Sequence, residues 1–308
     1  MDMAEARTAQ SEMAIDKVQL DRPIYGEVML SVHRLNRPTL SHLEYIHCRA
    51  GFTSESLRKI VRHLERTGFL SHLKQFDPEH PFRNLPYVFV DTTKSRRYLE
   101  RCYGVPYRRI SHKRRPVRVP TSDLNHDFGI ATYLSQTHAS AALTGEVMKY
   151  QDEIMAGAVA LNHPVTVVDG HKVIKTSVKP DGVCMIGDWA LLPEIDCGSM
   201  DVRPDDIEKR SIFRKELAYD WLYKKNALAA YGFQNKKWCV PFTIQGKDKT
   251  KKGATMRVNS CLEKMPVHVN RKLFFFVEQH VFVEAGSQVR ELEWIRGDGR
   301  QMTLPCFG

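Results

Sequence analysis

The chain has 308 residues, of which 42% are hydrophobic, and a formal net charge of +10. This length suggests roughly two domains of ~100–200 residues, and the hydrophobic content is ample for folded cores. No apolar run approaches the ~18 residues of a membrane-spanning helix, which argues against a transmembrane segment. The excess positive charge favours phosphate backbones or anionic surfaces as partners.

Two further features bound the class of protein. Residues 1–21 are polar and lack an apolar signal core, so we expect a disordered leader. The seven cysteines are widely spaced and contain no CxxC pair, which argues against a structural zinc site or a disulfide framework and indicates a reducing cytoplasm. Cys184 and Cys239 lie in apolar runs and are expected in a core.

Residues 22–103 predict a helical unit followed by two strands. Helices are expected at 26–35, 40–48 and 53–67, because Pro38 ends the first and Ser or Thr residues can cap the next two. Strands at 69–74 and 87–91 and a helix at 93–103 complete the unit. This is the element order of a winged helix-turn-helix domain.

The third of these helices has the sharpest hydrophobic periodicity in the chain. Leu57, Ile60, Val61 and Leu64 fall on one face of it. The opposite face carries four cations, namely Arg58, Lys59, Arg62 and Arg66. A solvated amphipathic helix gives the same pattern, but the turn at Gly51 and the two strands favour a recognition helix that enters the major groove of double-stranded DNA.

A basic segment follows, and prolines within it indicate a linker at 104–120. Six cations of this segment are candidate contacts to DNA phosphates: Arg108, Arg109, Lys113, Arg114, Arg115 and Arg118. A solvated charged tether is the alternative interpretation.

Residues 121–308 predict a second domain of mixed α and β structure. We expect helices at 122–137, 205–231 and 258–264. Strands are expected at 164–168, 171–176, 182–186, 189–195 and 238–244, with a last strand or strand pair at 273–283. The basic run 247–252 is expected to be a loop.

Three carboxylates mark the ends of two of these strands. Asp181 opens 182–186, and Glu194 and Asp196 close 189–195, so a hairpin would bring Asp181 close to Glu194. Residues 194 and 196 share a strand face, because side chains alternate with period two. Three converging carboxylates repel one another unless a cation or a proton is shared. The sequence therefore predicts a Mg²⁺ or Mn²⁺ site formed by Asp181, Glu194 and Asp196.

The order helix, three strands, helix, strand resembles the restriction-endonuclease-like fold, whose motif is PD followed by D/E-x-K. Pro180-Asp181 and Glu194-Ile195-Asp196 occupy this motif, with Asp196 where the lysine normally stands. Lys215 in the following helix is the candidate replacement cation. His126 is a candidate proton shuttle or phosphate contact, although it could equally cap its helix.

The joint pattern over 25–245 resembles the bacterial replication-relaxation protein family, which is similar to one class of plasmid mobilisation relaxases. The motifs that carry the resemblance are Asn125-His126-Asp127, Lys179-Pro180-Asp181, Pro193-Glu194-Ile195-Asp196 and Lys215-Glu216…Tyr219…Tyr223. The resemblance implies a DNA-binding protein of a plasmid, phage or integrative element that acts at a replication or transfer origin. A homodimer or another mobile-element protein is the expected protein partner. Two interpretations stay open, a metal-dependent nickase and a DNA-binding regulator with an inactive nuclease-like domain.

Overall fold

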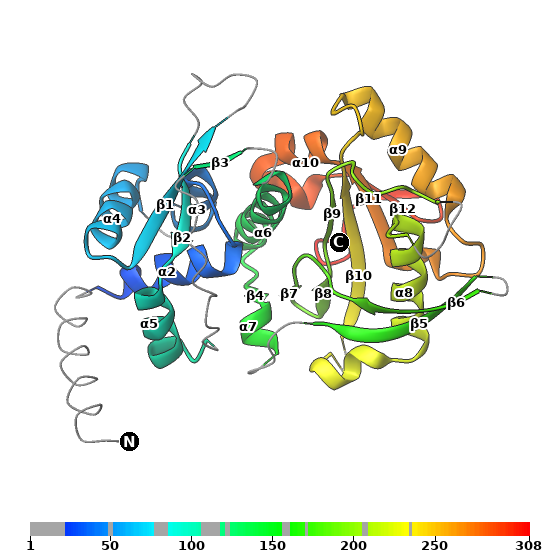
Figure 1. Ribbon diagram of the computed structural model, residues 1–308, viewed down its shortest axis with the longest axis horizontal. Coiled ribbons are helices and arrows are strands. Elements are labelled where there is room, and N and C mark those ends of the chain that lie inside the picture. Colours follow the sequence, from blue (N-terminus) through cyan, green and yellow to red (C-terminus); the bar gives the residue numbers. More distant parts are fainter. Residues whose placement is uncertain are drawn as a thin grey trace. The chain divides into compact units, whose positions relative to one another are not determined.

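The computed structural model describes nine stretches of the chain: 22–48, 52–76, 86–105, 118–120, 124–155, 161–169, 172–204, 209–233 and 236–308. The predicted leader and most of the basic segment lie outside them. The chain divides into two compact units, residues 1–121 and 122–308. Both contain helices and strands, so the mixed α and β structure predicted from the sequence is confirmed (Figure 1).

The first unit contains three helices, two strands, a helix and a short strand: α2 (Pro23–Leu35), α3 (Leu40–His47), α4 (Ser54–Arg66), β1 (Leu70–Phe76), β2 (Val88–Asp91), α5 (Thr93–Tyr103) and β3 (Arg118–Pro120). β1 is the central strand, antiparallel to β2 and parallel to β3. β3 lies within 104–120, which the sequence predicts to be a linker, so the end of that segment is a strand of this unit's sheet instead.

Local chemistry sets the ends of these elements. The Thr53 side chain accepts a hydrogen bond from the Ser56 N–H and so caps the start of α4. Gly68 has a φ of +77° just after α4, a conformation that favours glycine and turns the chain into β1. The buried carboxylate of Asp91 at the end of β2 accepts from Arg96 of α5 and contacts His33 of α2 at 3.1 Å. These contacts connect three elements of the unit.

The second unit begins with a long helix, two short elements and a hairpin: α6 (Asn125–Leu143), β4 (Met148–Tyr150), α7 (Gln151–Ile154), β5 (His163–Asp169) and β6 (Lys172–Val178). Three short strands and a helix follow: β7 (Cys184–Ile186), β8 (Trp189–Leu191), β9 (Glu194–Asp196) and α8 (Ile212–Lys224). The remaining elements are η3 (Ala227–Tyr231), β10 (Lys237–Ile244), α9 (Lys251–Lys264), η4 (Arg271–Leu273), β11 (Phe274–Glu278), α10 (Gln279–Ala285), η5 (Gly286–Glu291), β12 (Trp294–Arg296) and β13 (Gln301–Met302).

Eight of these strands form one mixed sheet, in the order β13-β12-β11-β10-β8-β7-β4 with β9 paired to β10. β10 runs parallel to β11 on one side and to both β8 and β9 on the other. Pro193 separates β8 from β9, because proline has no N–H to donate to a strand ladder. The β7–β8 hairpin is antiparallel, with Cys184 opposite Leu191. β5 and β6 pair only with each other.

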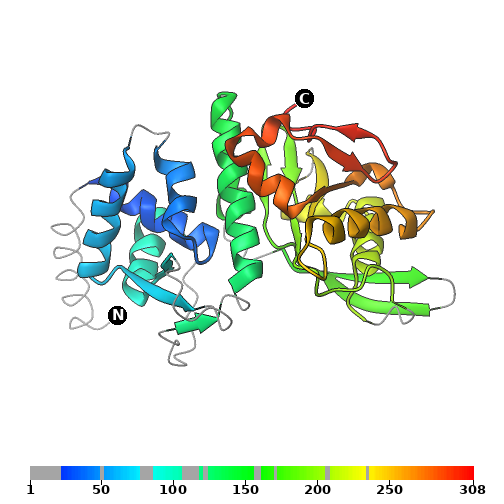
Figure 2. The ribbon, with the colours of Figure 1, turned by 90° about the horizontal axis from the view of Figure 1, so that it is seen from above.

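Helices cover both faces of the sheet (Figures 1 and 2). α6 packs on β9 and α10, while α8 packs on α9, which contacts β10 and β11. Gly129 allows α6 to approach closely, since a Cβ there would lie 2.3 Å from Cγ2 of Ile195. The core includes Cys184 and Cys239, both buried as expected from the sequence.

Several predicted boundaries are corrected. α6 continues to Leu143, α8 begins at Ile212 and α9 begins at Lys251. Within 273–283 only the first part is strand, because the chain turns into α10 at Gln279. No helix in the described stretches is long and apolar enough to cross a membrane.

Candidate nucleic-acid interface and carboxylate site

The α4 helix separates apolar and basic side chains as its sequence predicts. Leu57, Ile60, Val61 and Leu64 are buried. The four cations of the opposite face, Arg58, Lys59, Arg62 and Arg66, are all exposed. Lys59 pairs with Glu55 at 2.8 Å on the helix surface. The three arginines make no ion pair with any described residue, so their guanidinium groups are available to a ligand.

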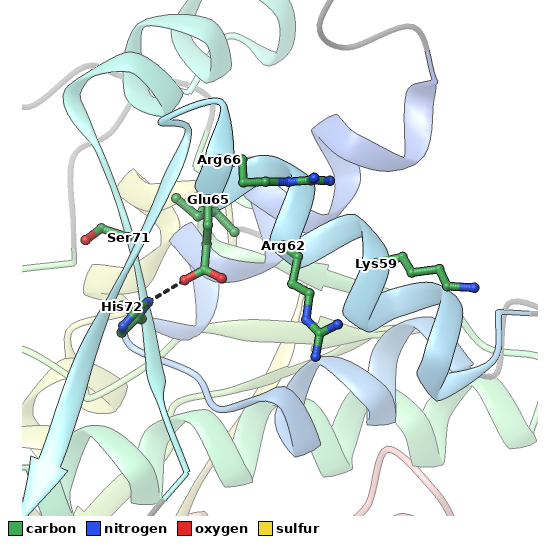
Figure 3. Close-up of a pocket in the computed structure, with 7 residues that line it drawn as sticks. Lys59, Arg62, Glu65, Arg66, Ser71 and His72 are labelled. Carbon is green, nitrogen blue, oxygen red and sulfur yellow. Dashed lines mark hydrogen bonds and ion pairs between the residues drawn. The ribbon is translucent and has the colours of Figure 1, made fainter.

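Part of this basic face borders an open hollow of about 660 Å³ between α4 and β1 (Figure 3). Seven residues line it: Lys59, Arg62, Glu65, Arg66, Leu70, Ser71 and His72. Three of the seven are cations and one is an acid. A cationic concavity beside an exposed helix suits a phosphate-bearing ligand.

The acid of the hollow, Glu65, lies 2.6 Å from Nδ1 of His72 on β1. The His72 ring in turn stacks on Tyr87, with ring centroids 4.5 Å apart. Sequence reasoning missed all three residues. Alternation along β1 groups His72 with the buried Leu70 and so does not identify it, and its partners come from two other segments of the chain.

Most of the predicted phosphate contacts in the basic segment cannot be placed. Arg108, Arg109, Lys113, Arg114 and Arg115 lie outside the described residues. The backbone of Arg118 pairs with Lys74 in the β1–β3 ladder.

The second candidate site lies where β9 meets α6 and α8. The Asp181 N–H donates to the Pro193 carbonyl at 3.1 Å, and the Asp181 carboxylate accepts from the Ile195 N–H at 2.7 Å. Its other oxygen, Oδ1, contacts Nε2 of His126 at 3.1 Å. His126 is the second residue of α6 and is exposed. Asp181 is therefore held against both β9 and α6. The sequence predicts its closeness to β9, from the expected hairpin, but not its contact with α6.

Glu194 opens β9 and is buried, with 2% of its surface exposed. Its Oε1 accepts from the Tyr219 hydroxyl at 2.5 Å, and its Oε2 accepts from the Lys215 ammonium. Lys215 and Tyr219 lie one turn apart on α8, so both reach the same carboxylate. Sequence reasoning identified Lys215 but assigned no role to Tyr219.

The charges of this site shift one another's protonation. Burial raises the pKa of Glu194 to about 7, and nearby Asp181 adds to the rise, while Lys215 opposes it. Burial alone would also raise the pKa of Asp181, but the His126 hydrogen bond and the Lys215 charge outweigh burial and lower it. The hydrogen bond to Asp181 raises the pKa of His126. The site therefore favours an ionised Asp181 beside a Glu194 that readily accepts a proton.

Asp196 has a different partner from the one that the sequence predicts. Its Oδ2 accepts from Nε of Arg257 on α9 at 2.5 Å, and both side chains are buried, with 1% and 6% exposed. Glu194 and Asp196 share a strand face, but their carboxylates reach two different helices. No group of three His, Cys, Asp or Glu residues in the described part of the chain could hold a metal ion. The structure thus brings together Asp181 and Glu194, and Asp196 is neutralised separately.

The site retains two neighbouring carboxylates, Asp181 and Glu194. Mg²⁺ is commonly held by one or two carboxylates together with waters and substrate phosphates, so a third carboxylate is not required. Comparison of the chain with models of protein families, with curated proteins and with solved structures found no match.

Proposed function

We propose that this chain is a DNA-binding protein in which α4 is the recognition helix of a winged helix-turn-helix domain. The observation that carries the proposal is the exposed row of Arg58, Arg62 and Arg66 opposite a buried apolar stripe. Arginine can bond two acceptors of guanine in the major groove, and its charge attracts the phosphate backbone. The order α2, α3, α4, β1, β2 supports this docking geometry.

The sequence resemblance to the replication-relaxation family gives the proposal its setting. We infer a protein of a plasmid, phage or integrative element that binds double-stranded DNA at a replication or transfer origin in the cytoplasm, as a homodimer or with another mobile-element protein. The net charge of +10 supports a polyanionic partner.

A second function, nicking of the bound DNA, is favoured by a specific observation. Asp181 and Glu194 lie beside Lys215, on a helix-flanked mixed sheet in which β9 and β10 are parallel. This arrangement supports a restriction-endonuclease-like core in which the lysine comes from α8 rather than from the strand. Asp181 and Glu194 would hold Mg²⁺ or Mn²⁺, which lowers the pKa of a bound water and neutralises charge on the scissile phosphate.

Each residue of this site has a distinct task in the proposal. Lys215 balances the Glu194 charge and, on a side chain with 20% exposure, faces an incoming phosphate. Tyr219 orients Glu194, and His126 orients Asp181. Because His126 is half-exposed, it can also move a proton between Asp181 and solvent.

DNA binding is tested first, by fluorescence anisotropy with duplexes from candidate origins and with an unrelated duplex. We expect affinity for both and a preference for the origin, with log Kd rising linearly with log salt concentration. Failure to bind any duplex at low salt contradicts the proposal.

Nicking is tested on supercoiled plasmid that carries the same origins, with Mg²⁺ or Mn²⁺ and with chelator. We expect conversion to the open circular form in metal only, and its loss in Asp181→Asn. Asp188→Asn is the matched control, because Asp188 lies in the β7–β8 turn and its side chain is 82% exposed. Binding without metal-dependent nicking leaves the alternative, a regulator with an inactive nuclease-like domain.

A further inference from the structure

One acid lies in the basic hollow between α4 and β1, and it contacts a histidine. Glu65 faces the same space as Arg62 and Arg66, where a carboxylate weakens attraction for phosphate (Figure 3). Its Oε1 lies 2.6 Å from Nδ1 of His72. A carboxylate in this position fixes the orientation of the imidazole and favours a proton on Nδ1.

The imidazole of His72 is also held from its other side. Tyr87, which precedes β2, stacks on the ring at a centroid distance of 4.5 Å and an interplanar angle of 28°. The His72 side chain remains 38% exposed, and its Nε2 has no partner among the described residues. The ring is thus fixed by Glu65 and Tyr87, while one nitrogen stays available.

We propose that this hollow binds one phosphate of the DNA backbone, with Nε2–H of His72 as a direct donor and with Arg62 and Arg66 as flanking charges. This inference rests on the proposed DNA binding and adds a binding residue outside the recognition helix. Glu65 is a positioning residue, because it acts through His72 and does not touch the phosphate.

The contact links DNA binding to protonation. In the neutral ring the Nδ1 proton is directed to Glu65, so Nε2 carries no hydrogen to donate. Phosphate binding through Nε2 therefore takes up one proton. The charged groups around the ring are Lys59, Arg62, Glu65 and Arg66 of the hollow, and Lys74 lies two positions further along β1. Tyr87 contributes its aromatic face. A bound phosphate shifts the balance toward the protonated ring.

The experiment measures affinity for an unrelated duplex from pH 5.5 to 8.5 at constant ionic strength, for the full chain and for His72→Gln. We expect the affinity of the full chain to fall by up to tenfold per pH unit through the range in which histidines titrate. The same decrease should be much smaller in His72→Gln. Below pH 6, His72→Gln should also reduce the slope of log Kd against log salt by roughly one.

Two further variants separate the roles of the neighbours. Glu65→Gln keeps an acceptor for Nδ1 but removes the charge, so the pH midpoint of DNA binding should move lower. Lys59→Gln is the matched control for lost charge on the rim. It should reduce the salt slope and leave the pH dependence unchanged.

The outcomes distinguish this inference from the proposed function. Binding whose pH dependence is the same in the full chain and in a folded His72→Gln overturns the phosphate contact and leaves DNA binding intact. No binding at any pH or salt concentration overturns DNA binding itself. If circular dichroism shows that His72→Gln is unfolded, Glu65→Gln decides, and an unchanged midpoint overturns the inference.

Discussion

At the scale of single residues, Glu194 combines nearly complete burial with two hydrogen-bond donors. Tyr219 and Lys215 replace the water that the carboxylate loses in the folded state. The exchange is incomplete, because burial still raises the pKa of Glu194 to about 7. A carboxylate in this condition exchanges its proton readily for a metal ion, which fits the role proposed for it.

The raised pKa makes stability depend on pH. A glutamate in the unfolded chain has an ordinary pKa of 4.5, so between pH 4.5 and 7 the folded state holds the Glu194 proton more tightly than the unfolded state. The stabilisation is complete below pH 4.5 and is lost as the pH rises to 7. Glu194→Gln mimics the protonated form and does not titrate. The unfolding free energy of this variant minus that of the unsubstituted chain should therefore increase by ~2 kcal/mol from about pH 5 to 7.5. Urea unfolding of both proteins at both pH values measures this increase. The prediction is contradicted if the free-energy difference between variant and unsubstituted chain is the same at both pH values.

The buried pair Asp196–Arg257 joins β9 to α9. Arg257→Met leaves the Asp196 charge buried without its partner, so we expect a loss of ~3–5 kcal/mol of unfolding free energy. Asp196→Asn/Arg257→Met should lose clearly less than the sum of the single changes. The exposed pair Lys247–Asp201 provides the control, because Lys247→Met should change the unfolding free energy little. Additive losses in the double variant would show that the two side chains are not coupled.

The site residues that the sequence predicts are set by local patterns, whereas the residues that it misses are set by tertiary packing. Asp181, Glu194 and Lys215 follow from a local motif and from strand alternation. Arg257 and the Glu65–His72 pair depend on which elements pack together; Arg257 lies 61 positions from Asp196 along the chain. A local pattern identifies a carboxylate, but only tertiary packing decides whether an arginine or a metal neutralises it.

At the scale of elements, α4 provides the sharpest test of recognition. Arg62→Ala should reduce binding to the preferred sequence by ~1–3 kcal/mol if Arg62 contacts a base, and should reduce binding to unrelated DNA less, because there Arg62 supplies only its charge. Arg97→Ala on α5 makes the same charge change at another exposed position of this unit. It should weaken binding to both duplexes equally. Competition binding measures, for each variant, the ratio of affinity for the preferred duplex to affinity for the unrelated duplex. If this ratio is the same for both variants, Arg62 contacts only phosphate.

The predictability of the elements follows from their surroundings. α4 has one solvent-exposed face and one buried face, so the 3.6-residue period of its apolar residues is visible in the sequence. α6 is buried over much of its length, so no apolar stripe with a period of 3.6 residues stands out in its sequence. Its end is marked by Gly145, which has a φ of +76°, and the prediction that ends the helix at 137 overlooked this signal. In 274–285 aromatic and β-branched residues resume at 281–283 after three polar residues, and propensity alone predicts more strand there. Packing of α10 on β10, β11 and α6 overrides that preference.

At the scale of the whole molecule, the two units and the segment between them divide the proposed work. One unit carries the cations of α4, and the other carries Asp181, Glu194 and Lys215. Phosphate contacts from a basic connecting segment would add affinity without adding sequence preference. Such contacts would keep the second unit near DNA that the first has selected, which raises its effective concentration there.

Neutralising Arg114 and Arg115 tests this division. If both contact phosphates, Arg114→Gln/Arg115→Gln should weaken binding to every duplex alike and lower the slope of log Kd against log salt by roughly one unit per lost contact. Lys264→Gln/Lys272→Gln removes the same charge from exposed positions of the second unit and should leave the slope unchanged. Salt titrations with an origin duplex and an unrelated duplex measure both variants. A slope that falls equally in both pairs would indicate that net charge alone attracts the DNA. An unchanged slope in the arginine variant would mean that the segment from Lys113 to Arg118 is only a solvated tether.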